Sequence, residues 1–138
     1  MAKPDPWRLD PASYPHIDTV QTRFADLDVL GHINNVAMVA LFETARTRFN
    51  HAVGLVRFRD TQWLIAAQEI NYLAEGGFPT DVTMAHGIGR IGGRSWTIIG
   101  AAFQNGVPIA TGDVTVVLDA PEMPADFRAA LGEYLISR

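Results

Sequence analysis

Polar and apolar residues alternate over residues 16–25, HIDTVQTRFA. Every second residue from Val20 to Phe24 falls on one side of an extended chain, and the residues between them are polar, which predicts a half-buried strand. The fifteen residues before this segment carry four prolines. Because proline interrupts regular pairing, we expect an irregular lead-in over residues 1–15.

A helical period follows over residues 35–51, where no glycine or proline interrupts the chain. At about 100° per residue the large apolar side chains gather on one face. That face consists of Met38, Leu41, Phe42, Ala45 and Phe49. The first half of the helix is apolar on every side, so we expect it to be buried all round. Gly54 is a suitable stop for this helix.

From residue 61 onward the pattern is typical of strands separated by turns. Apolar or alternating segments occupy residues 63–75, 81–91, 95–103 and 107–119. Gly92-Gly93 and Asn105-Gly106 favour tight hairpins, and residues 124–137 are predicted to be a short C-terminal helix. We expect the four strands to form an antiparallel meander that needs the 35–51 helix against its apolar face.

The chain therefore reads as one α+β domain over residues 1–138, with an antiparallel sheet wrapped around one long central helix. Such a sheet leaves free edge strands, and a symmetric dimer is a common way to cover them.

Composition excludes several classes of function. The chain has no cysteine, which excludes disulfides, thiolate metal sites and a cysteine nucleophile. Its net charge is −4 and its only lysine is Lys3, so no basic stripe for nucleic acid is present. No apolar run approaches the ~18 residues of a membrane span, and the N-terminus lacks the apolar core of a signal peptide, so we expect a cytoplasmic protein. The four histidines have no metal-ligand spacing, and no GxSxG motif occurs.

The densest polar cluster lies between the first strand and the long helix. It consists of Asp26, Asp28, Gly31, His32, Asn34 and Asn35. A helix N-terminus presents unpaired backbone N–H groups and a partial positive charge, which stabilise an oxyanion in acyl transfer. A carboxylate held there can attack a carbonyl or activate a water molecule.

Residues 23–46, RFADLDVLGHINNVAMVALFETAR, resemble the hotdog-fold acyl-CoA thioesterases of the 4-hydroxybenzoyl-CoA thioesterase superfamily. The shared pattern is an aspartate, a loop ending in His-x-Asn-Asn, and a helix with Phe-Glu-x-Ala-Arg. The resemblance implies a hotdog fold and hydrolysis of an acyl-CoA or acyl carrier protein thioester without a cofactor. It also implies a homodimer or homotetramer whose sites form between subunits.

The resemblance further implies roles for single residues. Asp28 matches the catalytic aspartate, acting as nucleophile or as base to a water molecule. The backbone N–H of Asn35 would polarise the thioester carbonyl. The side chains of His32, Asn34 and Asn35 would shape the loop and place water, which adds His32 to the catalytic residues, and Gly31 and Asn34 would contact the substrate. Met38 stands where an aromatic residue often follows Asn-Asn, which leaves the acyl preference open.

Structural roles compete with these assignments. Asp28 is also suited to a turn or a cap, and Asn34 to a helix N-cap. His32 could simply satisfy loop carbonyls. Asp26 could replace Asp28 as the acid on chemistry alone. Some hotdog thioesterases use a glutamate on the helix as base, which makes Glu43 the reserve catalytic residue, although a salt bridge one turn along the helix is its simpler interpretation.

The glycine-rich segment of residues 87–95 joins strand to strand, so it fits neither a Walker A motif nor a dinucleotide fingerprint. Its Arg90, Arg94 and Ser95 offer two cations and a hydroxyl group, which the polyanionic coenzyme A requires. In enzymes that the chain resembles, this neighbourhood contacts the nucleotide.

Two other functions remain open on the same fold. A non-catalytic domain would bind an acyl thioester or assemble with partners without turnover. The Asp28 carboxylate at a buried helix terminus favours the enzyme, because a scaffold does not need it. A hydratase or dehydratase would require a different Asp/His spacing, since His32 precedes the helix here.

Overall fold

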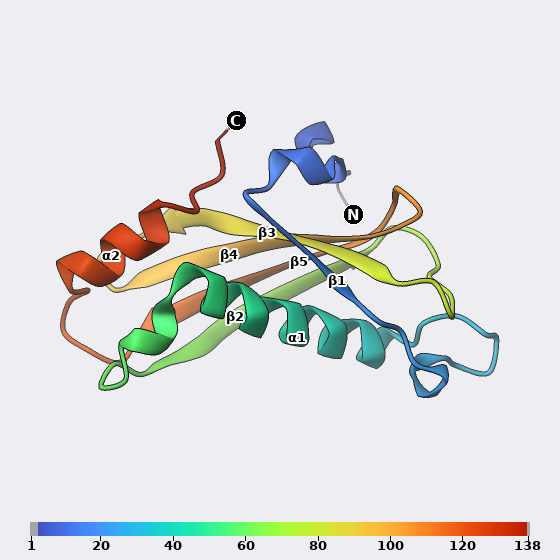
Figure 1. Cartoon of the computed structure of the whole chain (residues 1–138), viewed down its shortest axis with the longest axis horizontal. Helices are drawn as coiled ribbons and strands as arrows, with labels where there is room; N and C mark the ends of the chain where they lie inside the picture. The colour runs from blue at the N-terminus through green and yellow to red at the C-terminus, as the bar shows by residue number, and fades with distance from the viewer. Residues whose placement is uncertain (1–2, 138) are drawn as a thin grey trace.

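A computed structural model describes residues 3–137 of the chain. Its strands and helices follow in the order β1 (His16–Val20), α1 (Asn35–Val53), β2 (Trp63–Tyr72), β3 (Val82–Ile91), β4 (Ser95–Gln104), β5 (Val107–Leu118) and α2 (Ala125–Gly132). The five strands form one antiparallel sheet in the order β1-β3-β4-β5-β2. The sheet curves around α1, which runs along one of its faces (Figure 1). This arrangement confirms the predicted α+β hotdog architecture.

The position of β2 differs from the predicted meander. Only β3, β4 and β5 follow one another as hairpins, whereas β2 pairs with β5 at the far edge of the sheet. The segment from Leu73 to Asp81 therefore crosses the end of the sheet to reach β3. Strand order depends on long-range pairing, so hydrophobic alternation within each strand could not reveal it.

The buried face of α1 is the predicted one, with the addition of Val53. The expectation that its first half is buried on every side is wrong for the single chain, because Val36 is 77% exposed and Ala40 is exposed as well. The sheet covers only one side of the helix, and nothing in the described residues covers the other side at its first turns.

Two element boundaries also differ from the prediction. β1 ends at Val20, and a short 3-10 turn at Phe24–Asp26 replaces the end of the expected strand. α2 ends at Gly132 rather than near residue 137. Beyond it, the Ile88 N–H donates to the Tyr134 carbonyl at 2.8 Å and the Ile136 N–H donates to the Ile88 carbonyl at 2.9 Å, so the C-terminal residues pair with the edge of β3 instead.

The turn residues behave as their chemistry predicts. Asn105 and Gly106 have φ values of 50° and 77°, which suit the tight hairpin between β4 and β5. Gly54 ends α1 with φ 88°, and its N–H donates to the Asn50 and His51 carbonyls.

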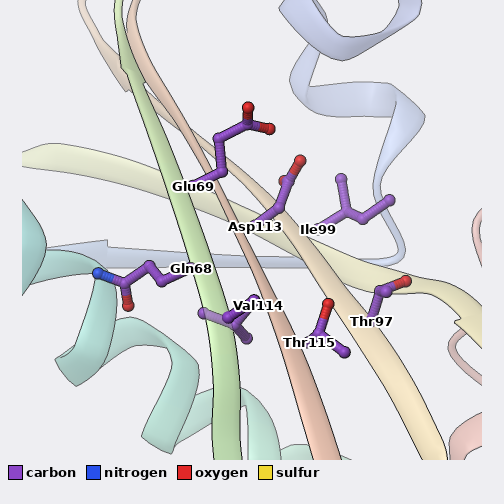
Figure 2. A pocket seen from close by; sticks show the side chains of 8 residues that line it. Gln68, Glu69, Thr97, Ile99, Asp113, Val114 and Thr115 are labelled. Carbon is purple, nitrogen blue, oxygen red and sulfur yellow. The ribbon is translucent and has the colours of Figure 1, made fainter.

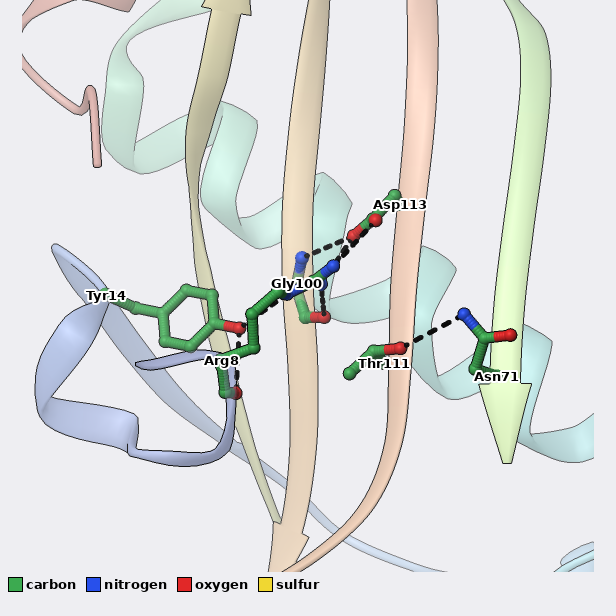
Figure 3. A network of polar contacts seen from close by, with 6 residues as sticks. All are labelled: Arg8, Tyr14, Asn71, Gly100, Thr111 and Asp113. Atoms are coloured by element: carbon green, nitrogen blue, oxygen red, sulfur yellow. Dashed lines mark hydrogen bonds and ion pairs between the residues drawn. The ribbon is translucent and has the colours of Figure 1, made fainter. Parts of the chain in front are cut away.

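The N-terminal residues pack on the outer face of the sheet, away from α1. Arg8 makes a bidentate ion pair with Asp113 of β5, at 2.7 and 2.9 Å, and donates to the Gly100 carbonyl at 2.9 Å (Figure 3). Tyr14 is buried against Ala85, Ala101 and Phe103 on this face. The lead-in is therefore fixed to the sheet by charge and by apolar contact.

Candidate active site

A pocket of about 360 Å³ opens at the N-terminal end of α1. Its walls come from the loop before the helix, from the first turns of α1, and from the end of β2 with the residues that follow it. The lining residues are Asp28, Leu30, His32, Ile33, Asn35, Met38, Tyr72, Leu73, Ala74, Glu75 and Gly76. Three of the predicted catalytic residues, Asp28, His32 and Asn35, therefore meet in one pocket of the size that small-molecule sites have.

Asp28 begins a tight loop that its own side chain helps to close. Its backbone N–H donates to the His32 carbonyl at 2.8 Å. Its carboxylate oxygen Oδ1 accepts hydrogen bonds from the Leu30 N–H at 2.9 Å and the His32 N–H at 3.1 Å. Within residues 3–137 no donor bonds to the other oxygen, Oδ2. The turn-forming role and a reactive role are thus compatible, because each uses a different oxygen.

Asn34 and Asn35 begin the helix. The Asn34 side-chain oxygen accepts from the Val36 N–H at 2.8 Å, which is an N-cap. The Asn35 N–H, one of the unpaired donors that every helix start has, meets no acceptor in the described part of the chain. It lies on the pocket that Asp28 lines, together with the positive end of the helix dipole.

Two further residues in this pocket escaped sequence analysis. The Tyr72 hydroxyl donates to the Asn35 carbonyl at 3.0 Å and joins the end of β2 to the first turn of α1. Glu75 Oε2 lies 2.9 Å from His32 Nε2. Tyr72 ends an apolar strand, and Glu75 lies in a loop directly before Gly76 and Gly77. Both residues reach the pocket because β2 pairs with β5 and its end lies next to the start of α1. Local sequence patterns do not predict this placement.

Asp26 does not line this pocket. Its side chain is buried and accepts from the Arg23 backbone N–H at 2.8 Å and from the Arg23 guanidinium at 2.9 and 3.2 Å. Its carbonyl accepts from the Asn34 N–H at 2.8 Å. Asp26 thus ties the loop to the helix start, and both of its carboxylate oxygens are engaged.

Glu43 projects from the exposed face of α1, with its side chain 75% exposed and its carboxylate 4.0 Å from the Arg46 guanidinium. It borders a separate hollow with Thr44, Thr47, Arg48 and His51. Glu43 lies eight residues after Asn35, about 12 Å along the helix axis at 1.5 Å per residue. Within one chain, the structure does not bring Glu43 to Asp28.

Arg90, Arg94 and Ser95 lie at the opposite end of the sheet. Ser95 pairs with Val117, which pairs with Leu64 near the start of β2, whereas the pocket lies at the other end of that strand. The ten residues of β2 span about 30 Å at the usual strand rise. These cations are therefore remote from Asp28 of their own chain, and no lysine or arginine lines the pocket among the described residues.

A second hollow, of about 320 Å³, lies on the outer face of β2, β4 and β5. Glu69 and Asp113 project into it from neighbouring strands, beside Thr97 and Thr115 (Figure 2). Asp113 is already paired with Arg8. None of the site residues predicted from the sequence lines this hollow.

The described residues also bear on the expectations about metal ions and membranes. No three histidine, aspartate or glutamate side chains gather there in an arrangement that could hold a metal ion. Neither helix in that part of the chain has the length and apolar character to cross a membrane.

Comparison with known proteins gives a family match over residues 22–131, to the model described as the thioesterase-like superfamily. No curated protein matches the chain significantly. A predicted thioesterase from Bacillus stearothermophilus superposes with a TM-score of 0.78 at 29% identity, over 88% of this chain and 97% of that one. A Pseudomonas aeruginosa protein gives 0.81 at 27% identity, over 93% and 96%. A Thermus thermophilus thioesterase complexed with coenzyme A and zinc gives 0.77 at 24% identity, over 88% and 95%.

Proposed function

Because the chain belongs to the thioesterase-like superfamily, we propose that it hydrolyses acyl-CoA thioesters, with Asp28 as the reacting carboxylate. One observation carries the proposal: Asp28 Oδ2, which no donor in residues 3–137 binds, and the unpaired Asn35 N–H line the same pocket. Thioester hydrolysis needs both groups, an oxygen base or nucleophile and a donor for the oxyanion. The coenzyme A bound to the Thermus thermophilus thioesterase supports the CoA form of the substrate.

The chemistry follows either of two balanced routes. In the direct route, Asp28 Oδ2 attacks the carbonyl carbon, the C–S bond breaks, and water then hydrolyses the acyl-aspartyl anhydride. In the general-base route, Asp28 takes a proton from water as the water oxygen attacks, and this proton passes to the departing thiolate. Both routes consume one water molecule and release a carboxylic acid and a thiol. In both, the oxyanion accepts a hydrogen bond from the Asn35 N–H, aided by the helix dipole.

The apolar part of the pocket suits the acyl group. Ile33 is 7% and Met38 is 3% exposed, and both lie between the loop and the core beneath α1. Leu73 and Ala74 complete this side of the pocket. The acyl group would pack against these side chains while its carbonyl faces Asp28 and Asn35.

The phosphates of the substrate would be bound by a second subunit. β2 has a neighbour on one side only, and Leu64 and Ile65 beside its free edge are 61% and 43% exposed. Antiparallel pairing of two β2 strands about a twofold axis places the start of one strand beside the end of the other. The partner subunit's Arg90 and Arg94 would then approach the pocket of this chain, which has no cation of its own among the described residues.

Thiol release from a panel of acyl-CoA and acyl carrier protein substrates tests the proposal. The chain has no cysteine, so a thiol reagent reports the released thiol alone. We expect turnover that falls at least ~100-fold in Asp28→Asn, the scale that general acid–base groups contribute. The exposed Asp60 provides a matched control, and Asp60→Asn should keep full turnover.

The other outcomes are equally informative. Turnover that survives in Asp28→Asn would contradict the role of Asp28 and direct attention to Glu43. Binding of acyl-CoA without any thiol release by folded wild-type protein would contradict the enzymatic function and favour a non-catalytic binding domain.

A further inference from the structure

We propose that Glu75 is a positioning residue, which holds Asp28 in its reactive orientation through His32. This inference rests on the proposed function, because it assigns Asp28 the chemistry. Glu75 follows β2, whereas Asp28 and His32 precede α1. The pocket is the place where these two segments meet.

The loop that carries Asp28 has little packing of its own. Val29 is fully exposed and Leu30 is 74% exposed. The loop is closed by internal hydrogen bonds, from the Asp28 N–H to the His32 carbonyl and from the Leu30 and His32 N–H groups to Asp28 Oδ1. The orientation of the Asp28 carboxylate therefore depends on the position of His32.

His32 is tied to the segment after β2. Its Nε2 atom lies 2.9 Å from Glu75 Oε2, and this is the one polar contact between loop residues 28–32 and any other segment in the described structure. The neighbouring Ile33 N–H donates to the Gly76 carbonyl at 2.9 Å, which fixes the base of the loop but not its tip. The segment that carries Glu75 is itself anchored, since the Leu73 and Ala74 N–H groups both reach the Ile109 carbonyl of β5.

Charge argues for positioning rather than for direct assistance. Glu75 and Asp28 are both acidic, so Glu75 gives no electrostatic help to a carboxylate that must react as an anion. Its side chain is 73% exposed, so the contact with His32 is modest in energy. Small displacements of a reacting group nevertheless reduce the rate strongly, because the reacting atoms must stay aligned.

The test compares Glu75→Gln, Glu75→Leu and the exposed control Glu133→Leu. Glutamine keeps an oxygen that can face His32 Nε2, whereas leucine does not. We expect kcat to fall about five- to tenfold in Glu75→Leu with little change in KM, and less than about twofold in Glu75→Gln. Glu133→Leu should match the wild type in both constants.

A second readout does not depend on turnover. Amide hydrogen exchange reports the Leu30 and His32 N–H groups that hold the Asp28 carboxylate. We expect both to exchange faster in Glu75→Leu but not in the control. The ¹⁵N chemical shift of His32 Nε2 should change in Glu75→Leu, because this atom loses its contact with the Glu75 carboxylate, and it should match the wild type in the control.

Failure of this proposal is distinguishable from failure of the proposed function. Unchanged kcat and unchanged amide exchange in Glu75→Leu would overturn the positioning role while leaving the thioesterase intact. Equal loss of kcat in the glutamine and leucine variants would also overturn it, because the charge and not the contact would then matter. If the wild type releases no thiol, the proposed function fails, and the exchange and ¹⁵N data alone decide whether Glu75 orders the loop.

Discussion

His86 is a histidine sealed inside the core beneath α1, at 2% exposure. Its ring stacks on Phe49 at 5.8 Å and meets Phe42 edge-on at 6.1 Å. Gly100 makes room for it, since a Cβ there would lie 2.6 Å from the ring nitrogen Nε2. Burial lowers the pKa of His86 to about 3, with further lowering by Arg46 and His16 and a small opposing effect of Asp18. The folded protein therefore holds this imidazole neutral.

A depressed histidine pKa makes stability depend on pH with a definite sign. The unfolded chain binds a proton near pH 6.5 and the folded chain only near pH 3, so the free energy of unfolding falls as the pH drops through this window. We expect a loss of about 2 kcal/mol between pH 7 and pH 5 from this group. Urea unfolding at both pH values should show the loss in the wild type and in His51→Gln, which replaces an exposed histidine. The loss of unfolding free energy should be much smaller in His86→Gln. If this variant kept the pH dependence of the wild type, His86 would not be its cause.

At the scale of elements, the first turn of α1 owes its position to β2. The Tyr72 hydroxyl bonds the Asn35 carbonyl at the helix start. At the other end of the helix, the Tyr134 hydroxyl bonds the Ala52 carbonyl at 3.2 Å. Two tyrosines thus fix the two ends of α1 by the same kind of bond, and only the first lies at the pocket.

The two tyrosine hydrogen bonds allow a comparison of two matched variants. Tyr72→Phe removes the bond beside the Asn35 N–H, which the proposed mechanism uses for the oxyanion. We expect kcat to fall about two- to tenfold, the range that one neutral hydrogen bond supports. Tyr134→Phe should destabilise the fold by a similar free energy and leave kcat unchanged. Equal kcat values in the two variants would show that the position of the helix start does not limit the reaction.

The same two elements show what sequence could and could not predict. The helix, its buried face and the Asn105-Gly106 hairpin follow from local patterns, as does the gathering of Asp28, His32 and Asn35 beside the helix start. The pairing of β2 with β5 is non-local, so the apolar character of β2 predicted a strand but not its neighbour. Tyr72 and Glu75 enter the pocket only through that pairing, and for this reason they could not be predicted.

At the scale of the whole molecule, two surfaces that a second subunit could cover stay open within residues 3–137 of one chain. The free edge of β2 is one of them, and the first turns of α1, with Val36 77% exposed, are the other. The first half of α1 is apolar on every side, and the prediction that one chain buries it completely is wrong. The same pattern is expected of a helix that a second subunit covers. A twofold dimer across β2 would cover apolar surface and would also bring Arg90 and Arg94 of each subunit to the pocket of the other.

Subunit mixing tests this arrangement directly. We expect Asp28→Asn to be inactive, and a double variant, Arg90→Ala with Arg94→Ala, to lose most of its turnover at low substrate concentration because the phosphates lose their partners. If Asp28 of one subunit works with the arginines of the other, co-expressing the two inactive forms rebuilds an intact site. About a quarter of wild-type activity should return, because half of the dimers are mixed and one of their two sites carries no substitution.

The same experiment separates the alternatives. If Asp28 and the arginines served one site within a single chain, both sites of a mixed dimer would carry a substitution, and mixing would restore nothing. If the arginine variant alone kept full turnover, the two cations would have no part in binding. Differently tagged subunits allow the mixed dimer to be purified, and sedimentation confirms that it contains two chains. Antiparallel pairing at β2 predicts that activity returns only in the purified mixed dimer. This pairing places the β3–β4 hairpin of one subunit, with Arg90 and Arg94, beside the Asp28 loop of the other.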